Sequence, residues 1–333
     1  MADRLGMTFS NHPLENILAI VGPTASGKST LALTLFATAK QNGIGLEIIS
    51  MDSALVYRGM NIGTAKPEKN ELLEVPHHGI DIREPWETYS AAQFAKDVIQ
   101  WVSEIKQRGN QPVIVGGTML YWRALMQGLS DLPASTPEVR LAIAKEASIL
   151  GWSEMYSKLQ EIDPTTASRL PAGDTQRISR ALEVYSMTGL PMSYFFEKEP
   201  YSNSRDTSSF KHLLISLEPE NRTWLHERIE KRFMQMIEKG LLNEVKLLLQ
   251  HPQINESLPS MRAVGYRQAI AHLSGQTNYQ EFVYSGLVAS RQLAKRQLTW
   301  LRAMPSRTII DPSKENFLTK AVQICLDHLK QFK

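Results

Sequence analysis

A glycine-rich segment near the start of the chain has the residue types and spacing of a phosphate-binding loop. The pattern G-x-x-x-x-G-K-[ST] is matched by eight consecutive residues: Gly22, Pro23, Thr24, Ala25, Ser26, Gly27, Lys28 and Ser29. Glycines let successive backbone N–H groups turn toward phosphate oxygens, and the start of a following helix adds positive potential. Lys28 supplies a point charge, and the hydroxyl of Ser29 or Thr30 can hold Mg²⁺. The segment predicts a site for a phosphorylated compound.

The carboxylate that accompanies this loop in ordinary nucleotide hydrolases has no good counterpart. Such enzymes carry an Asp after a second apolar strand, but residues 112–115 lead into Gly116-Gly117-Thr118 and residues 213–217 lead into Glu218. Asp52 is the one carboxylate early in the chain that directly follows an apolar run. It could cap a turn. The carboxyl ends of parallel strands meet at one edge of a sheet, so we expect Asp52 and Thr118 to share a crevice with the glycine-rich loop.

The elements that would position these residues alternate between strands and helices. Short apolar runs bounded by turn residues predict buried strands at 17–21, 47–51, 112–115 and 212–217. Helical spacing follows at 29–40 and 91–108. This alternation predicts an α/β fold, with a doubly wound parallel sheet like that of P-loop NTPases.

The middle of the chain has a different pattern, with helical periodicity at 137–150, 153–161 and 175–187 and no convincing strand. We interpret residues 1–120 as the first part of the core and residues 121–205 as an all-helical insertion domain. A polar linker at 202–209 would lead back to the sheet. Residues 206–333 would complete the core and add C-terminal helices, and beyond Asn221 we expect helices to the end.

Composition narrows the class of protein. The chain has 333 residues, 42% of them hydrophobic, and one cysteine, Cys325, which cannot form an intramolecular disulfide. Neither a signal peptide nor a membrane-spanning run is evident, so we expect a cytoplasmic protein with no membrane partner. Residues 222–307 contain thirteen Lys and Arg against six Glu and no Asp, which is compatible with nucleic acid but weak evidence for it. His77 and His78 lack Cys or well-spaced carboxylate neighbours, so we predict a structural turn there rather than a metal site.

Eight segments in order resemble the bacterial type of the tRNA dimethylallyltransferase (tRNA isopentenyltransferase) family. They are GPTASGKS at 22–29, DSALVYR at 52–58, NIGTAKP at 61–67, VPHHGID at 75–81, GGTMLY at 116–121, DTQRISR at 174–180, RAVGYRQ at 262–268 and RQLAKRQLTWLR at 291–302. The resemblance implies transfer of a dimethylallyl group from dimethylallyl pyrophosphate to N6 of adenosine 37, in tRNAs that read codons beginning with U. It also implies assistance by Mg²⁺, held near Ser29, and we expect a monomer.

The resemblance implies a role for each site residue. Asp52 would be the general base that takes the N6 proton, and Thr118 would hydrogen-bond the adenine or the reacting groups. The loop Gly22 to Thr30 would hold the pyrophosphate together with an arginine, Arg228 or Arg232, of which we favour Arg232. The residues that would contact the tRNA anticodon stem-loop are Asp52, Ser53, Ala54, Leu55, Thr118, Arg140, Gln176, Arg177, Ile178, Ser179, Arg180, Arg262, Ala263, Val264, Gly265, Tyr266, Arg267, Ser290, Arg291, Gln292, Leu293, Ala294, Lys295, Arg296 and Gln297.

Two other classes of protein share parts of this pattern. A small-molecule kinase would also combine a P-loop with an Asp-Ser pair after its second strand, and would turn over ATP with a small acceptor. A non-catalytic RNA-binding module could retain a degenerate P-loop, and would bind tRNA without forming a prenylated product. Intact Lys28, Ser29 and Asp52 speak against the second class.

Overall fold

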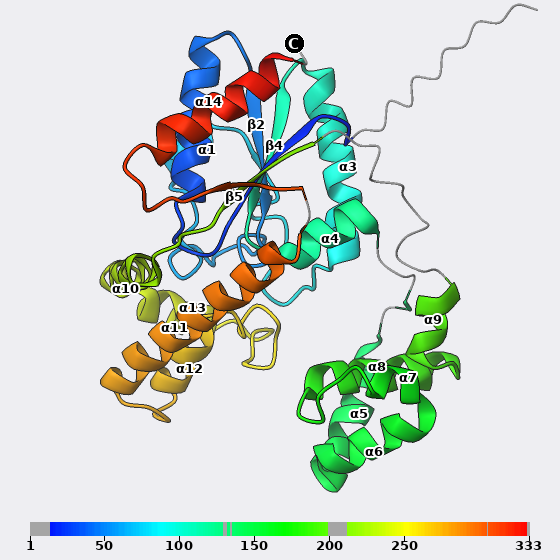
Figure 1. Ribbon diagram of the computed structural model, residues 1–333. Helices are drawn as coiled ribbons and strands as arrows, with labels where there is room; N and C mark the ends of the chain where they lie inside the picture. Colours follow the sequence, from blue (N-terminus) through cyan, green and yellow to red (C-terminus); the bar gives the residue numbers. More distant parts are fainter. Residues whose placement is uncertain (1–13, 129–131, 134, 199–211, 305, 332–333) are drawn as a thin grey trace, which may run out of the picture. The chain divides into compact units, whose positions relative to one another are not determined.

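A six-stranded, all-parallel sheet forms the centre of the larger of two units in the computed structural model (Figure 1). The structure describes residues 14–128, 132–133, 135–198, 212–304 and 306–331. The strand order is β3-β2-β4-β1-β5-β6. The strands are β1 (Ile17–Val21), β2 (Leu46–Met51), β3 (His77–His78), β4 (Gln111–Gly116), β5 (His212–Leu217) and β6 (Thr308–Ile310).

Helices cover both faces of this sheet. The side chains of Leu18, Ile48 and Val113 face α1 (Lys28–Gln41) and α14 (Phe317–Lys330), with which they form one buried core. Because side chains alternate along a strand, Ile49 and Ile114 face the opposite side, where α3 (Ala91–Gln107) packs (Figure 1). Strands β2 and β4 therefore bury side chains on both faces of the sheet, as is usual for parallel sheets. The predicted doubly wound α/β fold is confirmed.

Further helices belong to the unit that contains the sheet. They are α2 (Lys69–Glu74), α4 (Met119–Gln127), α10 (Arg222–Glu238), α11 (Leu241–Leu248), α12 (Tyr266–Leu273) and α13 (Tyr279–Arg302). The side chain of Asn221 starts α10 by accepting the N–H groups of Thr223 and Trp224. Helix α13 packs against α10 and α12 (Figure 1). None of the helices in the described residues is long and apolar enough to cross a membrane.

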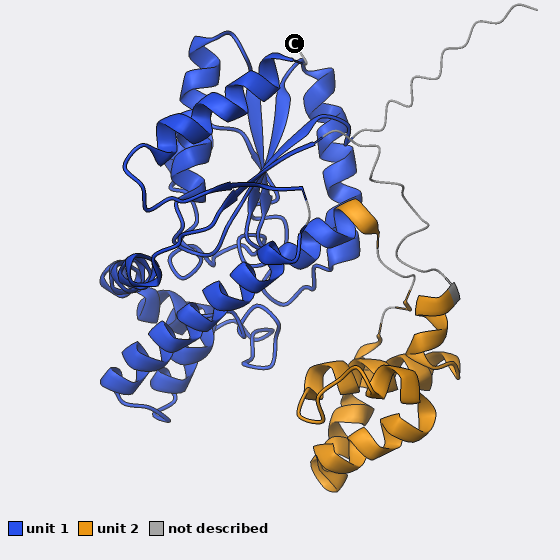
Figure 2. Ribbon diagram, viewed as in Figure 1, with its two compact units in different colours: residues 1–125, 208–333 blue, residues 126–207 orange. Residues whose placement is uncertain are grey.

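The second unit, residues 126–207, is a separate helical bundle (Figure 2). Its helices are α5 (Pro137–Leu150), α6 (Trp152–Ile162), α7 (Pro164–Ala167), α8 (Thr175–Thr188) and α9 (Met192–Lys198). Met155, Leu159 and Ile178 lie in its own hydrophobic core. Caps fix the helix starts, because Thr136 accepts the N–H of Val139 and Asp174 accepts that of Arg177.

The predicted elements agree with the structure to within one residue at each end, but several elements were not predicted. The expectation of helices from Asn221 to the end is wrong at β6, where three residues pair with β5, and in the irregular segment 250–264. His77 and His78 form a short edge strand beside β2 instead of a turn. The predicted linker at 202–209 lies outside the described residues. Tyr121, which we placed in the insertion, belongs to the larger unit because its ring stacks on Phe94 of α3 at 4.5 Å.

Candidate active site

The glycine-rich loop connects β1 directly to α1 and has the backbone shape of an anion cradle. Ala25 and Gly27 both have positive φ angles, 63° and 98°, which turns successive N–H groups toward a common centre. A side chain at Gly22 would place its Cβ 2.6 Å from Ser26 Oγ and 3.0 Å from the carbonyl oxygen of Leu217. The close approach of the loop to β5 therefore requires glycine at position 22. Because α1 begins at Lys28, its N-terminus also faces this cradle.

Lys28 is held within the loop in this structure. Its ammonium group donates to the carbonyl oxygen of Pro23 at 2.7 Å. The pKa of Lys28 is lowered to about 7, mainly by burial and then by the positive charge of Arg232, while the negative charge of Asp52 partly opposes both effects. The charges of Lys28, Arg232 and Asp52 therefore interact electrostatically across this site. An anion that binds between Lys28 and Arg232 would relieve their mutual repulsion.

Asp52 and Thr118 meet at the carboxyl ends of β2 and β4. Asp52 Oδ1 accepts the N–H groups of Ala54 at 2.8 Å and Leu55 at 3.3 Å, so this carboxylate does cap a turn. Thr118 Oγ1 accepts the N–H of Ser53 at 3.1 Å, and the N–H of Thr118 donates to Met51 at 3.2 Å. The two strand ends are thereby connected. The hydrogen bonds of Asp52 within the described residues fall on Oδ1, and Asp52 also lines the pocket described next.

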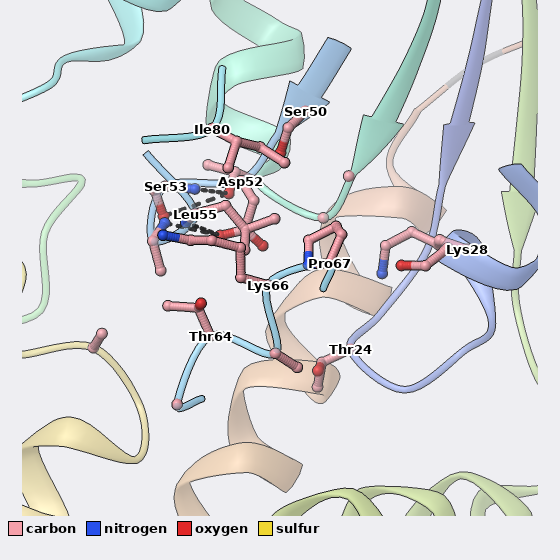
Figure 3. A pocket seen from close by; sticks show the side chains of 18 of the residues that line it. Thr24, Lys28, Ser50, Asp52, Ser53, Leu55, Thr64, Lys66, Pro67 and Ile80 are labelled. Atoms are coloured by element: carbon pink, nitrogen blue, oxygen red, sulfur yellow. Dashed lines mark hydrogen bonds between the residues drawn. The ribbon is translucent and has the colours of Figure 1, made fainter. Parts of the chain in front are cut away.

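A pocket of about 1520 Å³ in the larger unit brings these groups together (Figure 3). Lys28 reaches it from the P-loop side, whereas Asp52, Ser53 and Leu55 lie on the opposite side in Figure 3. Predicted site residues that line the pocket are Thr24, Lys28, Ser29, Thr30, Asp52, Ser53, Ala54, Leu55, Thr118, Arg232, Arg262, Ala263, Val264, Ser290, Leu293, Arg296 and Gln297. The sheet edge thus places the P-loop, the carboxylate and the hydroxyl around one space, as expected from parallel strands.

The two candidate arginines of α10 occupy different environments. Arg232 lines the pocket and donates to the carbonyl oxygen of Thr64 at 3.2 Å. Burial lowers the pKa of its guanidinium group and Asp52 opposes this effect. Arg228 donates instead to the carbonyl oxygen of Ala25 at 2.8 Å and lies 4.8 Å above the ring of Trp224. Arg232 is therefore placed to contact a bound anion, and Arg228 braces the backbone of the P-loop.

Helix α13 contributes a structural bridge as well as exposed charge. Gln297 Oε1 accepts the N–H of Thr24 at 2.8 Å, and its Nε2 donates to the carbonyl oxygen of Gly117 at 3.0 Å. Its amide thus joins the P-loop to the end of β4. Arg291 forms an ion pair with Glu230 at 3.2 Å, which limits its availability for a partner. Lys295 and Arg296 are exposed.

Some predicted contact residues are buried inside the protein. Ile178, Tyr266 and Ala294 have exposed fractions of 0%, 0% and 2%, and Gly265 is also buried. The side chains of Ile178, Tyr266 and Ala294 pack in the protein interior, and glycine has no side chain, so these four positions present no side chain at the surface. Contact between their segments and RNA stays a prediction. The resembling segments extend over such residues because a helix that presents polar side chains on one face must bury the other.

The predicted residues of the helical unit lie outside the pocket. Arg140, Gln176 and Arg177 are exposed on that unit. Arg177 is also within 3.4 Å of Asp174, and Arg180 donates to the carbonyl oxygen of Pro133 at 2.7 Å. Ser179 donates to Glu183 at 2.9 Å. Arg140, Gln176 and Arg177 are thus exposed, whereas Ser179 and Arg180 are half-buried and bonded within their own unit.

The pocket wall contains residues to which sequence reasoning gave no role. Segment 61–67 lines the pocket, and its backbone is held by the carboxylate of Glu244 in α11. Lys66 also lines it; its side chain is 3% exposed and pairs with Asp81. The motif NIGTAKP is one of the segments that carry the family resemblance, but nothing in the sequence around Glu244 identifies this residue as its partner. Its backbone partners in segment 61–63 lie more than 180 residues away in the chain.

Glu218 and the two histidines contact other groups of the protein. Glu218 is buried and pairs with Arg307 at 2.6 Å, and it does not line the pocket. His78 contacts Glu47 at 2.7 Å, and His77 contacts the carbonyl oxygen of Val75 at 2.6 Å. Within the described residues no cluster of three His, Cys, Asp or Glu side chains could hold a metal ion.

The all-parallel sheet, with a phosphate-binding loop after β1 and polar groups after β2 and β4, defines an α/β protein of the P-loop-like class. Residues 55–304 match the model of the IPP transferase family. The chain belongs to this family. The predicted resemblance is thereby confirmed.

Relatives cover nearly the whole chain. The tRNA dimethylallyltransferase of Polynucleobacter asymbioticus is 51% identical over 94% of this chain and 95% of its own. That of Burkholderia thailandensis is 48% identical over 93% and 94%. The solved structure of tRNA isopentenylpyrophosphate transferase from Bacillus halodurans has a TM-score of 0.66 at 33% identity, covering 95% of this chain and 97% of its own. A eukaryotic dimethylallyltransferase acting on tRNA has a TM-score of 0.74 at 25% identity, covering 95% and 79%.

Proposed function

We propose that the pocket transfers a dimethylallyl group from dimethylallyl pyrophosphate to N6 of adenosine 37, in tRNAs that read codons beginning with U. The observation that carries the proposal is that the P-loop, Arg232, Asp52 and Thr118 line one pocket. Cations on one side of it suit a pyrophosphate, and a carboxylate on the other suits a group that must lose a proton. The names of the relatives support a prenyl group as the group transferred and tRNA as its acceptor.

The donor would bind with its pyrophosphate in the P-loop. As the bond from carbon to the pyrophosphate oxygen breaks, negative charge grows on the leaving group, and groups already aimed at it lower the barrier. Lys28, Arg232 and the backbone N–H groups at the start of α1 would provide this stabilisation. Lys28 would leave the Pro23 carbonyl to reach the anion.

The residues present fit a magnesium ion that is bound mainly through its substrate. Mg²⁺ takes oxygen ligands and often uses few protein groups beside phosphate oxygens and water. Ser29 lines the pocket at the start of α1, and no three-residue cluster of stronger ligands competes within the described residues. Ser29 would hold the ion, and Mg²⁺ would supply charge neutralisation on the pyrophosphate.

The acceptor nitrogen requires a base because its lone pair is delocalised into the adenine ring. As the new C–N bond forms, N6 gains positive charge and its proton becomes acidic. Asp52 would take that proton on Oδ2, while the N–H groups of Ala54 and Leu55 hold Oδ1 in place. Pyrophosphate leaves with the electron pair of the broken C–O bond. Thr118 would orient the adenine from the neighbouring strand end.

The acceptor would have to leave its stack to enter this pocket, as bases generally do when enzymes act on them. Arg262 and Arg296 line the pocket and are exposed, so they would contact the RNA near the flipped base. Arg140, Gln176 and Arg177 of the helical unit would contact the anticodon stem-loop. We also propose that the enzyme works as a cytoplasmic monomer, because one chain supplies every residue assigned to the pocket.

A label-transfer assay tests the proposal against both other classes of protein. The protein is incubated with unmodified tRNA, Mg²⁺ and either dimethylallyl pyrophosphate labelled in its carbon chain or ATP labelled at its γ-phosphate. We expect label in tRNA from the first donor and no label transfer from the second. Transfer from ATP to a small acceptor would support a kinase. Binding of tRNA with no labelled product would support an RNA-binding module.

A further inference from the structure

One carboxylate in α11 organises the wall of the pocket that faces Arg232. Glu244 Oε2 accepts the backbone N–H groups of Asn61 at 2.9 Å and Ile62 at 2.7 Å, and Oε1 accepts that of Gly63 at 3.1 Å. The hydroxyl of Tyr266 donates to Oε1 at 2.6 Å. Burial, followed by the charge of Glu244, raises the pKa of Tyr266, so this hydroxyl remains a donor. Four donors thus converge on one side chain.

The segment held in this way touches the proposed pyrophosphate site directly. The carbonyl oxygen of Thr64, next to Gly63, accepts a hydrogen bond from Arg232 Nη2 at 3.2 Å. Packing leaves the segment little freedom, because a Cβ at Gly63 would lie 2.5 Å from the ring of Tyr266. Thr64 is fixed further, since its hydroxyl donates to the carbonyl oxygen of Met60 at 2.7 Å. A continuous set of contacts therefore runs from Glu244 through the backbone to the guanidinium group.

We propose that Glu244 is a positioning residue for the pyrophosphate site, because it fixes segment 61–64 so that the Thr64 carbonyl aims Arg232 at the leaving group. The inference rests on the proposed function, in which Arg232 contacts the pyrophosphate. Glu244 does not line the pocket, so it acts through Arg232 and does not contact the substrate itself.

The chemistry of the carboxylate explains why an amide would not replace it. Both oxygens of Glu244 accept from backbone N–H groups, and a glutamine would turn an NH₂ group toward at least one of these donors. Backbone donors left without an acceptor are costly, so the segment would shift to find water. The Thr64 carbonyl would move with it, and Arg232 would lose its orientation. Glu244→Gln should therefore weaken the binding of pyrophosphate without removing any group that touches it.

A double-mutant cycle tests this route. Titration calorimetry with inorganic pyrophosphate and Mg²⁺ would measure the dissociation constant for wild type, Glu244→Gln, Arg232→Ala and the double variant. We expect Glu244→Gln to raise the constant by roughly three- to thirtyfold, which lies within the range of coupling between groups in one network. The same substitution should have no further effect in the Arg232→Ala protein. Glu238→Gln, which alters an exposed carboxylate at the end of α10, is the matched control and should leave the constant unchanged.

Each other outcome overturns the inference. An unchanged dissociation constant in Glu244→Gln would show that the pyrophosphate site does not depend on the contacts of Glu244 with segment 61–64. Equal weakening in the wild-type and Arg232→Ala backgrounds would show that Glu244 acts independently of Arg232. If Glu244→Gln does not fold, Tyr266→Phe removes one of the four donors and is measured in the same cycle, with a smaller expected effect. A wild-type protein that does not bind pyrophosphate would instead overturn the proposed function, and this inference with it.

Discussion

At the scale of single residues, Asp52 has an observed structural task and, in the proposed mechanism, a chemical one. Its Oδ1 caps the turn after β2, and the residue lines the pocket. The expectation of a turn cap and the expectation of a base are therefore compatible. The turn holds the carboxylate at the strand end, and a fixed carboxylate is what the proposed proton transfer would need.

Asp52→Asn should retain the turn because the amide oxygen can still accept the N–H groups, but it removes the proton acceptor. We expect the chemical rate to fall by ~10²–10⁴-fold while the affinity for tRNA stays almost unchanged. Single-turnover kinetics at saturating substrate measures this rate. Asp327→Asn, on the exposed side of α14, is the control. A near-normal rate in Asp52→Asn would exclude it as the base.

The low pKa of Lys28 makes the affinity for pyrophosphate depend on pH. Lys28 in the free protein is protonated below a pKa of about 7 and loses its proton as the pH rises through that value. A bound anion favours the protonated form and raises this pKa. The affinity for pyrophosphate should therefore be highest below pH 7 and should fall above it, by up to about tenfold for each pH unit.

Lys28→Arg is the control for this pH dependence, because arginine stays charged throughout the range. Titration of the ligand itself affects both proteins equally, so the ratio of their dissociation constants isolates Lys28. This ratio should change between pH 6 and pH 9. A constant ratio would show that Lys28 keeps its proton over the whole range.

At the scale of elements, the edge of the sheet depends on one buried carboxylate in β2. Glu47 bonds to Arg108 at the end of α3 at 2.8 Å and to His78 of β3 at 2.7 Å. Its side chain is 5% exposed. The pKa of Glu47 is lowered to about 2, first by the hydrogen bond from Arg108 and then by those with Asn110 and His78, while burial opposes this shift. Glu47 thus connects β2, β3 and the end of α3 at this edge of the sheet, in the strand that leads to Asp52.

Glu47→Gln should destabilise the fold by about 1–3 kcal/mol at neutral pH, because it weakens a buried, charged network. The folded-state pKa of Glu47 lies below its unfolded value, so its contribution is complete above about pH 4.5 and is lost as the pH falls toward 2. The difference in unfolding free energy between wild type and variant should shrink over that interval. Urea unfolding at several pH values measures it. A difference that stays constant would contradict the charged network.

Elements differ in how well the sequence predicts them, for physical reasons. The strand β1 is apolar throughout and stands next to a glycine loop, so local pattern suffices. The strand β6 has only three residues and forms because β5 lies beside it. The P-loop is likewise local, whereas the contacts of Glu244 with Asn61 and of Gln297 with Thr24 join residues far apart in the chain. Periodicity carries no information about such pairs.

At the scale of the whole molecule, two separate units carry the polar residues proposed for tRNA. Only the larger unit contains the pocket, and within it the ion pairs distinguish residues that look equivalent in sequence. Arg291 and Arg296 stand in the same helix, but Arg291 pairs with Glu230 and Arg296 is exposed beside the pocket. The local excess of positive charge therefore overstates the number of groups available to RNA.

Arg296→Ala should flatten the plot of log affinity for tRNA against log salt concentration by ~0.7–0.9 units of slope, because one phosphate contact and its released counterions are lost. All tRNAs should weaken about equally, since phosphate contacts carry no sequence information. Arg291→Ala should change the slope much less, because its partner is Glu230. Equal slopes in wild type and Arg296→Ala would show that Arg296 makes no phosphate contact and is an ordinary solvated surface residue.

The most direct test of the central claim is to map the product on the RNA. Unmodified tRNAs that read codons beginning with U, and others as controls, are incubated with the protein, dimethylallyl pyrophosphate and Mg²⁺. Mass spectrometry of nuclease fragments then locates the added group. We predict one dimethylallyl group on adenosine 37 of the first set and none on the controls. Modification at another position, or no modification of any tRNA, would contradict the account.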